Sequence, residues 1–555
     1  MHAIVERLLR QRGIVDFEKF FNPSLADLAD PHELPGVPAA VDKMIEAVRA
    51  GRRIVVFGDY DCDGVCATAI MTLALRAIGG NVDTFLPRRL DEGYGMSDEA
   101  VIRMLGEFPG VELVVTVDNG INSISQIADL RSEGIETIVT DHHLPTVNMF
   151  GQMLLPNAVA IVNPKVAAPE HLQELCGASV AFLLANALVD AATKRGLYSG
   201  PKVGGPLLVL AGLATVTDVM PLVGQNRILV AESLKRFHTW APLGLRELYA
   251  RASRSGTAAM STKDYGFLIG PRINAAGRVA NGEESLELIL TDDREIAREA
   301  ARIVDGRNVE RKQIESGMVE QAMTQVVEGA SAQVIDLPDG PVEQQGIAGI
   351  VAARIMEKVM VPTGVLAGGH GSARAPEGYN VRDALKACAK YLTRYGGHAA
   401  AAGFSVKEGM VDEFRGAFAA ECAKQKAVWL SQNAGASAAC GEDESLPRYD
   451  LELSASDLTL ELAEEIARME PFGEGNKEPV FLFRGAVLSD VRFLGQESKH
   501  LAFTANGFKG VWWGRGDLVE ELRASVAPVD VAFTIEISTY GEPHVELRPV
   551  EIRKI

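Results

Sequence analysis

Three aspartates at alternate positions are the residues of this 555-residue chain with the clearest potential for chemistry. They lie in the segment Gly58-Asp59-Tyr60-Asp61-Cys62-Asp63-Gly64, after an apolar strand predicted over 54–57 and before a helix predicted over 65–78. Carboxylates crowded at a strand end repel one another, and cations that prefer oxygen ligands would relieve this repulsion. A solvated acidic turn would be the better interpretation of such a motif standing alone, because short motifs often match by chance.

Two further motifs follow two more predicted strands. They are Val117-Asp118-Asn119-Gly120, after the run 113–117, and Thr140-Asp141-His142-His143, after the run 137–140. Open α/β sheets bind ligands at the carboxyl ends of their strands, so acids and imidazoles from three strand ends converge on one edge. This mixed set suits Mn²⁺ or Mg²⁺ better than structural Zn²⁺. Two such ions about 4 Å apart can stabilise both the attacking and the leaving oxygen of a phosphoryl transfer. The sequence therefore predicts hydrolysis of a phosphate ester.

These segments resemble the first three motifs of the DHH phosphoesterases in order and spacing. The segment 214–221 resembles their fourth acid motif, although Asp218 alone could equally be a helix cap or a buried hydrogen-bond acceptor. The resemblance implies that Asp141 orients its neighbours and that His143 stabilises charge on the scissile phosphate or protonates the leaving group. The implied catalytic residues are His143, Asp118 and His142; the implied ligands of two Mn²⁺ or Mg²⁺ ions are Asp61, Asp63, Asp118, His142 and Asp218, with Asp59 a further ligand or a partner of the ligands.

Two segments that contain arginine indicate which phosphate ester is the substrate. Pro87-Arg88-Arg89 before Gly93-Tyr94-Gly95, and the segment GPRINAAGR over 270–278, resemble the RecJ exonucleases of this superfamily. Arg89 and Arg278 are therefore candidate phosphate ligands, because a guanidinium fork matches phosphate oxygens. A structural salt bridge is the alternative for each of them.

A second domain carries two signatures that resemble the DHHA1 domain. They are Gly371-Ser372-Ala373-Arg374 and the run GGHAAAAG over 396–403. Ser372, Arg374 and His398 offer donors for a terminal phosphate, and the resemblance implies that this region holds the 5′ end of a strand. Close packing of a helix on a strand is the alternative for the glycine-rich run. Glu343-Gln344 stands where RecJ proteins commonly have Trp-His, and Ala375 stands where a serine is frequent. These differences put in doubt any contact that the histidine or the serine makes in those proteins.

The elements around these residues predict an α/β fold: a parallel-sheet DHH domain joined by a long helix to a smaller α/β DHHA1 domain, followed by an OB-fold β-barrel. The charged stretch 283–329 predicts a solvated connecting helix. Five β-type runs, beginning with 480–488 and with a helix over 517–525 after the third, follow the OB-fold order. The predicted parts are an N-terminal helical segment (1–50), the DHH domain (51–225), a helical region (226–330), the DHHA1 domain (331–425), a linker (426–450) and the barrel (451–555).

The barrel adds aromatic and basic residues. Trp512, Trp513 and Arg515 have the chemistry to stack on bases and follow a phosphate backbone. Core packing is the better explanation for any single aromatic residue. Strand alternation exposes only one of the two tryptophans.

Composition limits the partners and the compartment. The formal net charge of −19 argues against a protein that coats DNA by general electrostatics, so local basic patches must hold any nucleic acid. Six cysteines without a zinc-like pair fit a reducing cytoplasm. Charged residues in the first two turns argue against a signal peptide. Asp218 interrupts the most apolar stretch, which argues against a membrane span.

The resemblance implies a single-stranded-DNA-specific exonuclease that acts from 5′ to 3′ and releases 5′-mononucleotides in DNA repair and recombination. The enzymatic alternative is a DHH-family cyclic-dinucleotide or nanoRNA phosphodiesterase, and the non-enzymatic alternative is a single-strand-binding scaffold. The expected partner is single-stranded DNA, with a single-strand-binding protein and a repair helicase as further candidates. We expect a cytoplasmic monomer.

Overall fold

The computed structural model describes the chain except for residues 90, 94, 201–203, 254–258, 339, 434–448, 526, 539–541 and 555. Contacts divide the chain into two compact units. Unit 1 contains Met1–Asp27, Pro221–Val223 and Ala436–Ile555, and unit 2 contains Leu28–Met220 and Gly224–Gly435. The expected segment 1–50 is thus shared between the units, and most of the expected linker lies outside the described residues.

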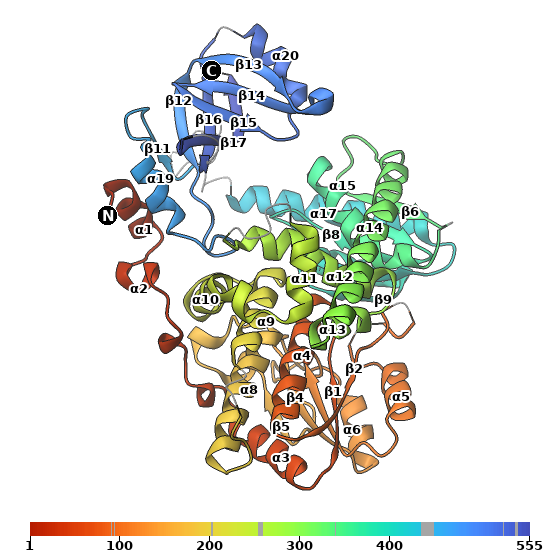
Figure 1. Ribbon diagram of the computed structural model, residues 1–555. Coiled ribbons are helices and arrows are strands. Elements are labelled where there is room, and N and C mark those ends of the chain that lie inside the picture. Colours follow the sequence, from red (N-terminus) through yellow and green to blue (C-terminus); the bar gives the residue numbers. More distant parts are fainter. Residues whose placement is uncertain are drawn as a thin grey trace. The chain divides into compact units, whose positions relative to one another are not determined.

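A five-stranded parallel sheet in the order β2-β1-β3-β4-β5 forms the first layer of unit 2. The runs predicted over 54–57, 113–117 and 137–140 match β1, β3 and β4 to within one residue at each end. Because β1, β3 and β4 are neighbours, the three motifs that follow them begin side by side (Figure 1). The strands are β1 (Arg53–Phe57), β2 (Asn81–Phe85), β3 (Leu113–Val117), β4 (Glu136–Thr140) and β5 (Ala160–Val162).

Helices cover both faces of this sheet (Figure 1). On one face Val55 and Phe57 of β1 pack with Met104 of α5 and Ile127 of α6 in a buried cluster. On the other face α4 and α8 pack together over the central strands. The α4 helix is apolar on all sides and almost entirely buried, as expected for a core helix. The helices are α3 (Val37–Arg49), α4 (Cys62–Ala77), α5 (Asp98–Glu107), α6 (Ile124–Ser132), α7 (Pro164–Ala167), α8 (Gly177–Lys194), α9 (Gly204–Thr217), α10 (Gly224–Trp240) and α11 (Leu243–Ala252).

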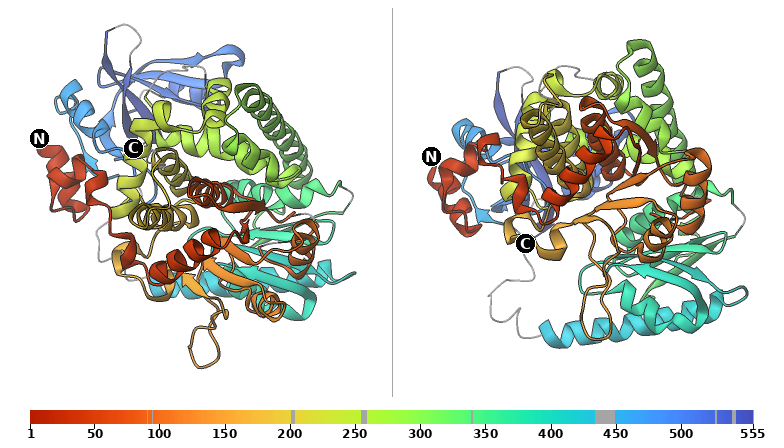
Figure 2. Two further views of the ribbon diagram at one scale, coloured as in Figure 1. Left: turned by 60° about the horizontal axis from the view of Figure 1, so that its bottom comes forward. Right: turned by 90° about the horizontal axis from the view of Figure 1, so that it is seen from below.

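The loop that joins β4 to β5 projects from unit 2 in the left view of Figure 2, where it is drawn in orange. Hydrogen bonds from the Phe150 and Gln152 amides to Asn148 Oδ1 order its tip. The side chains of Met149 and Phe150 are exposed there.

The charged stretch 283–329 is not one helix. It forms two helices, α13 (Glu283–Leu290) and α14 (Arg294–Met323), with a break between them. Asp293 caps the start of α14 by accepting hydrogen bonds from the amides of Glu295 and Ile296. An aspartate at this position stabilises the start of a new helix. Only one face of α14 is solvated, where Glu295 pairs with Arg298, and the other face, which includes Ala297 and Val304, is buried. Before it come a π-helix (Asp264–Ile269) and α12 (Gly270–Val279).

A second sheet follows in the order β6-β7-β8-β10-β9. The β6 and β7 strands are parallel, and the other pairs are antiparallel. A small apolar cluster that includes Phe404, Phe414 and Phe418 forms its core. Its elements are β6 (Gln333–Leu337), α15 (Glu343–Val359), β7 (Thr363–Ala367), β8 (His370–Arg374), α16 (Val381–Ala387), β9 (Leu392–Gly397), β10 (Ala401–Val406) and α17 (Val411–Asn433).

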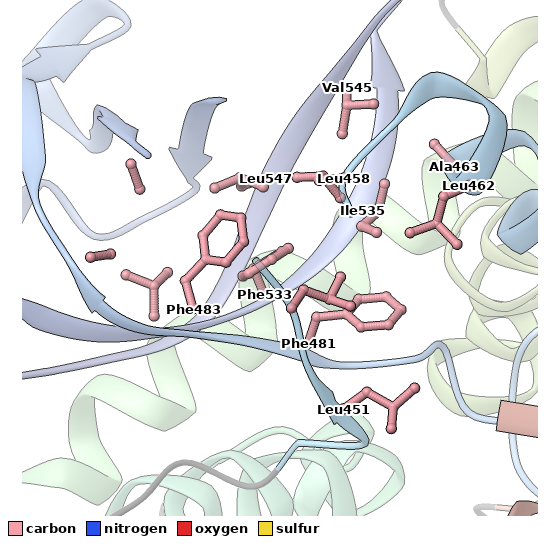
Figure 3. Close-up of a cluster of buried hydrophobic side chains, with 14 of the residues drawn as sticks. Leu451, Leu458, Leu462, Ala463, Phe481, Phe483, Phe533, Ile535, Val545 and Leu547 are labelled. Carbon is pink, nitrogen blue, oxygen red and sulfur yellow. The ribbon is translucent and has the colours of Figure 1, made fainter. Parts of the chain in front are cut away.

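Unit 1 contains the predicted OB-type barrel, as a sheet in the order β11-β12-β16-β17-β15-β14-β13. The run expected over 480–488 is interrupted at Val487, and the chain continues beyond it as a second strand. The first barrel strand therefore consists of β12 and β13. A further short strand, β11, lies at the edge of the sheet. Phe481, Phe483 and Phe533 fill the core (Figure 3). The elements are α1 (Ala3–Gln11), α2 (Phe17–Phe21), β11 (Leu451–Glu452), α19 (Leu460–Ala467), β12 (Phe481–Ala486), β13 (Leu488–Leu494), β14 (His500–Ala505), β15 (Phe508–Trp512), α20 (Val519–Ala524), β16 (Val529–Ser538) and β17 (His544–Lys554).

The two tryptophans differ as strand alternation predicts. Trp512 packs partly against the barrel core, and Trp513 is 58% exposed. The Arg515 guanidinium lies 4.7 Å from the Trp512 ring centroid, and His500 meets Trp513 edge to face. Among the described residues of either unit, the model contains no helix that is both long and apolar enough to span a bilayer.

Candidate metal centre

The segment 58–64, here called the carboxylate loop, leaves β1 and turns directly into α4. Asp61 caps α4 by accepting a hydrogen bond from the Gly64 amide at 3.0 Å. Asp59 accepts one from the Tyr60 amide at 2.8 Å. A Cβ added to Gly64 would lie 2.6 Å from the Asp59 Cβ, so only glycine permits this tight turn.

Asp63 is oriented by a helix that the sequence motifs did not include. Its two carboxylate oxygens accept hydrogen bonds from the amides of Gly177 and Ala178, at 2.7 and 2.8 Å. These amides open α8, and the positive end of a helix dipole favours a carboxylate. The only local signal for this contact was a Gly-Ala pair at the start of an apolar helix.

Asp118 has a φ of +60°, in the left-handed region that few residues other than glycine adopt. Such backbone strain persists where surrounding contacts enforce it, often at functional sites. Asn119 supplies one such contact, because its Nδ2 donates to the Val117 carbonyl at 3.0 Å. Gly177 makes room for Asp118, since a Cβ there would lie 2.5 Å from Asp118 Oδ1.

The two histidines at the end of β4 have different partners. Asp141 Oδ1 accepts hydrogen bonds from both histidine amides and lies 2.8 Å from His143 Nδ1, so Asp141 orients its neighbours as expected. His142 Nε2 instead faces carboxylates, at 3.2 Å from Asp118 and 3.7 Å from both Asp63 and Asp218. Burial lowers the pKa of His142, so its ring is neutral at pH 7 and has the form that can bind a metal ion.

The raised pKa values and unpaired oxygens of these buried carboxyl groups are those expected at a cation site. Burial, followed by repulsion from Asp61, raises the pKa of Asp59 to about 7. Burial and the charge of Asp63 raise the pKa of Asp218 to about 8, and burial raises the pKa of Asp118 as well. One buried oxygen on each of Asp59, Asp118 and Asp218 has no hydrogen-bond partner within the described parts of the chain. Unpaired buried carboxylates are costly unless cations compensate them, so the donor set fits divalent metal ions.

The potential ligand atoms form three overlapping groups, each within 4.8 Å. Asp118 and His142 each belong to two of them, and of these two side chains only the carboxylate has two oxygens with which to serve two ions. All six expected ligands therefore come together, although Asp218 is far from the others in sequence. The groups are Asp59 with Asp61 and Asp118; Asp63 with His142 and Asp218; and Asp118 with His142 and His143.

Three arginines, Arg89, Arg278 and Arg374, gather beside the carboxylate loop and are here called the arginine cluster. Burial, and then repulsion from Arg89, lowers the pKa of Arg278 to about 10, and the same two causes lower the pKa of Arg374. Arg89 lies over the ring of Tyr60, at 5.4 Å from its centroid. Among the described residues none of the three forms an ion pair, so the salt-bridge alternative for Arg89 and Arg278 finds no support.

The two other expected phosphate donors are Ser372 and His398. Ser372 lies on β8 with Arg374, and a Cβ on Gly349 of α15 would contact both side chains. His398 is exposed in the turn between β9 and β10, and its amide donates to the Ala401 carbonyl. Within the described structure, no contact joins the His398 side chain to the arginine cluster.

We expect the metal-free protein to lose thermal stability as the pH rises from 4 to 8. Asp59 and Asp218 have pKa values raised from 3.8 to about 7 and 8, so the stability that they contribute is present below pH 3.8 and is lost as the pH passes these values. Mn²⁺ at about 100 times its dissociation constant should add about 2.7 kcal/mol. Differential scanning fluorimetry with EDTA or MnCl₂ measures both effects. An unchanged melting temperature with saturating Mn²⁺ at pH 8 would contradict the metal site.

Comparisons with known proteins cover nearly the whole chain. Family models match at residues 53–202 (DHH family, N-terminal domain), 329–425 (DHHA1 domain) and 449–548 (RecJ OB domain). The single-stranded-DNA-specific exonuclease RecJ of Dickeya dadantii is 35% identical over 575 residues, which cover 98% of this chain and 95% of that protein.

Solved structures agree with the sequence comparison. The crystal structure of RecJ from Thermus thermophilus in complex with Mn²⁺ matches with a TM-score of 0.82 and 32% identity, over 99% of this chain and 75% of that one. The Mg²⁺ complex of the same protein matches with a TM-score of 0.76 and 31% identity, over 99% and 74%. The extent of identity and the shared fold show that this chain belongs to the RecJ family of the DHH phosphoesterases.

Proposed function

We propose that this protein is a single-stranded-DNA-specific exonuclease that hydrolyses phosphodiester bonds at the metal centre. The observation that carries the proposal is the cluster of four strand-end aspartates, His142 and Asp218, with buried oxygens that have no hydrogen-bond partner in the described structure. Full-length similarity to exonucleases of this specificity supports the substrate. An intact ligand set disfavours a scaffold without activity.

The side chains around the centre have separable roles. Asp59, Asp61, Asp63, Asp118, His142 and Asp218 would hold two Mn²⁺ or Mg²⁺ ions. When bound, these ions would activate water and neutralise charge on the scissile phosphate. The amides of α8 keep the Asp63 carboxylate directed at the centre.

His143 is suited to act on the phosphate itself. Burial alone would lower its pKa, but the hydrogen bond and charge of Asp141 raise the pKa to about 9. Its imidazole therefore carries a proton at neutral pH. It would stabilise charge on a non-bridging oxygen or protonate the leaving 3′ oxygen.

The arginine cluster supports digestion from the 5′ end. Three guanidinium groups beside the carboxylate loop would bind the 5′ phosphate of a strand, with Ser372 and His398 as further donors. The next phosphate along the strand would then reach the metal centre. Hydrolysis there releases a 5′-mononucleotide and leaves a new 5′ phosphate, so digestion proceeds from 5′ to 3′.

The barrel of unit 1 offers a contact for longer strands. Trp513 is exposed, and Arg515 and His500 lie beside the two tryptophans. Exposed aromatic rings stack on bases without sequence preference. A phosphodiesterase for dinucleotides has no need of such a surface, which favours the exonuclease over that alternative.

The decisive assay is digestion of single strands labelled at either end, with Mn²⁺ or with EDTA, alongside a duplex and a dinucleotide. We expect Mn²⁺-dependent release of the 5′ label first, as a mononucleotide, with the duplex spared. Release of the 3′ label first would overturn the direction. Cleavage of the dinucleotide without degradation of long strands would favour the alternative phosphodiesterase.

Replacing Arg374 with alanine should raise KM for a 5′-phosphorylated strand by about 10- to 100-fold, because hydrogen bonds to charged groups contribute about 1.5–3 kcal/mol each. KM for a strand with a 5′ hydroxyl should change little. Steady-state kinetics on the two strands measure this difference. Arg382→Ala, at an exposed position of α16, is the control, and an equal effect on both strands would argue against a role in binding the 5′ phosphate.

The compartment and further partners are part of the same proposal. All five cysteines that the structure describes are free and buried, which suits the reducing cytoplasm. A monomeric state, and binding to a single-strand-binding protein or a repair helicase, stay predictions from the resemblance.

A further inference from the structure

The α12 helix contacts the carboxylate loop. Asn274 Oδ1 accepts a hydrogen bond from the Cys62 amide at 2.7 Å. Cys62 is buried and stands between Asp61 and Asp63. This bond therefore fixes the peptide group between Asp61 and Cys62, which lies between two of the expected ligands.

The α12 backbone also packs directly on the loop. A Cβ added to Gly277 would lie 2.5 Å from the Tyr60 carbonyl oxygen, and one added to Gly282, just beyond α12, would lie 3.3 Å from the Tyr60 Cα. Glycines at these points let the two backbones approach more closely than side chains would allow. This close approach holds the loop against α12.

The same helix carries an arginine of the cluster one turn further on. Arg278 Nη1 donates to the Gly346 carbonyl of α15 at 3.2 Å. A Cβ on Gly346 would lie 2.3 Å from the Arg278 carbonyl oxygen, so α12 and α15 also meet closely. Arg272 anchors α12 to α14 through Asp305 at 2.9 Å. Figure 1 shows α12 among the helices α11, α14 and α15.

We propose that Asn274 is a positioning residue for the metal centre, and that α12 holds the carboxylate loop and the phosphate-binding Arg278 in a fixed geometry. The proposal rests on the proposed function for the role of Arg278, but its metal-binding part does not. A neutral amide suits position 274, because it accepts the Cys62 hydrogen bond without adding another negative charge beside the aspartates. Without this acceptor the Cys62 amide is left unpaired and the two flanking carboxylates can move.

The first test is direct measurement of Mn²⁺ affinity by isothermal titration calorimetry of the full chain. Asn274→Ala should weaken binding about 10- to 100-fold, the usual effect of removing a group that orients metal ligands. Asn274→Asp keeps the acceptor and should bind Mn²⁺ at least as tightly as the unmodified protein. The control is Asn308→Ala on α14, which removes another buried asparagine whose partner is Arg311.

Unchanged affinity in Asn274→Ala would overturn the proposal, and so would a tenfold or greater loss in Asn274→Asp. Should the alanine variant fail to fold, the aspartate variant decides alone by the same criterion. These titrations need no DNA, so they stand even if the protein does not digest single strands.

The second test separates positioning from substrate binding. Asn274→Ala should lower kcat on single-stranded DNA at fixed Mn²⁺ about tenfold or more and leave KM within twofold, because Arg278 stays in place. Arg278→Ala should mainly raise KM. A rise in KM alone for Asn274→Ala would show that residue 274 contacts the strand and would overturn the positioning role.

Discussion

Replacing Asp118 with asparagine is expected to abolish degradation of single-stranded DNA, with kcat reduced by roughly 1000-fold or more. Asp118 belongs to two of the three ligand groups, so its loss affects both expected ions. Asparagine tolerates the positive φ at this position and is nearly isosteric, so the backbone should be preserved. Gel assays with a labelled strand measure the activity.

The same substitution should stabilise the protein when metal is absent. Asp118 is buried among like charges, and its neutral replacement removes that repulsion. The melting temperature in EDTA should rise, while the gain from added Mn²⁺ should shrink. Asp129→Asn, on the exposed face of α6, is the control for both measurements. Activity within tenfold of the unmodified protein would rule out Asp118 as a shared ligand.

Replacing His143 with glutamine is expected to lower kcat by about 100- to 10,000-fold, the usual contribution of a general acid or base. The hydrogen bond to Asp141 holds the ring and its proton, and glutamine cannot donate a proton to the leaving oxygen. Single-turnover digestion measures this step. His171→Gln, at a half-exposed side chain that pairs with Glu33, is the matched control.

Mn²⁺ titration of the His143 variant distinguishes two roles. Nearly unchanged affinity with a large loss of kcat fits action on the scissile phosphate. A loss of affinity as large as that of Asp118→Asn would make His143 a metal ligand, which its place in one of the ligand groups also allows.

Local sequence patterns were sufficient to predict strands of the parallel sheet, the edge that carries the site and the order of the barrel strands. Runs of Val and Ile predicted β1, β3 and β4 to within one residue, because these strands are buried on both faces and so carry a continuous apolar signature. The three acid and histidine motifs could be assigned to one edge, since parallel strands share a direction. The barrel was recognisable from its order of strands, although the break at Val487 was not, because both halves are β-type sequence.

Only the tertiary structure decided which distant residues complete the centre. The approach of Asp218 to His142, the amides of Gly177 and Ala178 on Asp63, and the hydrogen bond between Asn274 and the carboxylate loop join segments far apart in sequence. Periodicity reports which face of an element is apolar, but not which other element packs there. The break before α14 depended on one capping aspartate, and the division of residues 1–50 between two units depended on packing at a distance. The sequence by itself therefore determined the chemistry of the ligands, and the folded chain decided the contacts that hold them in place.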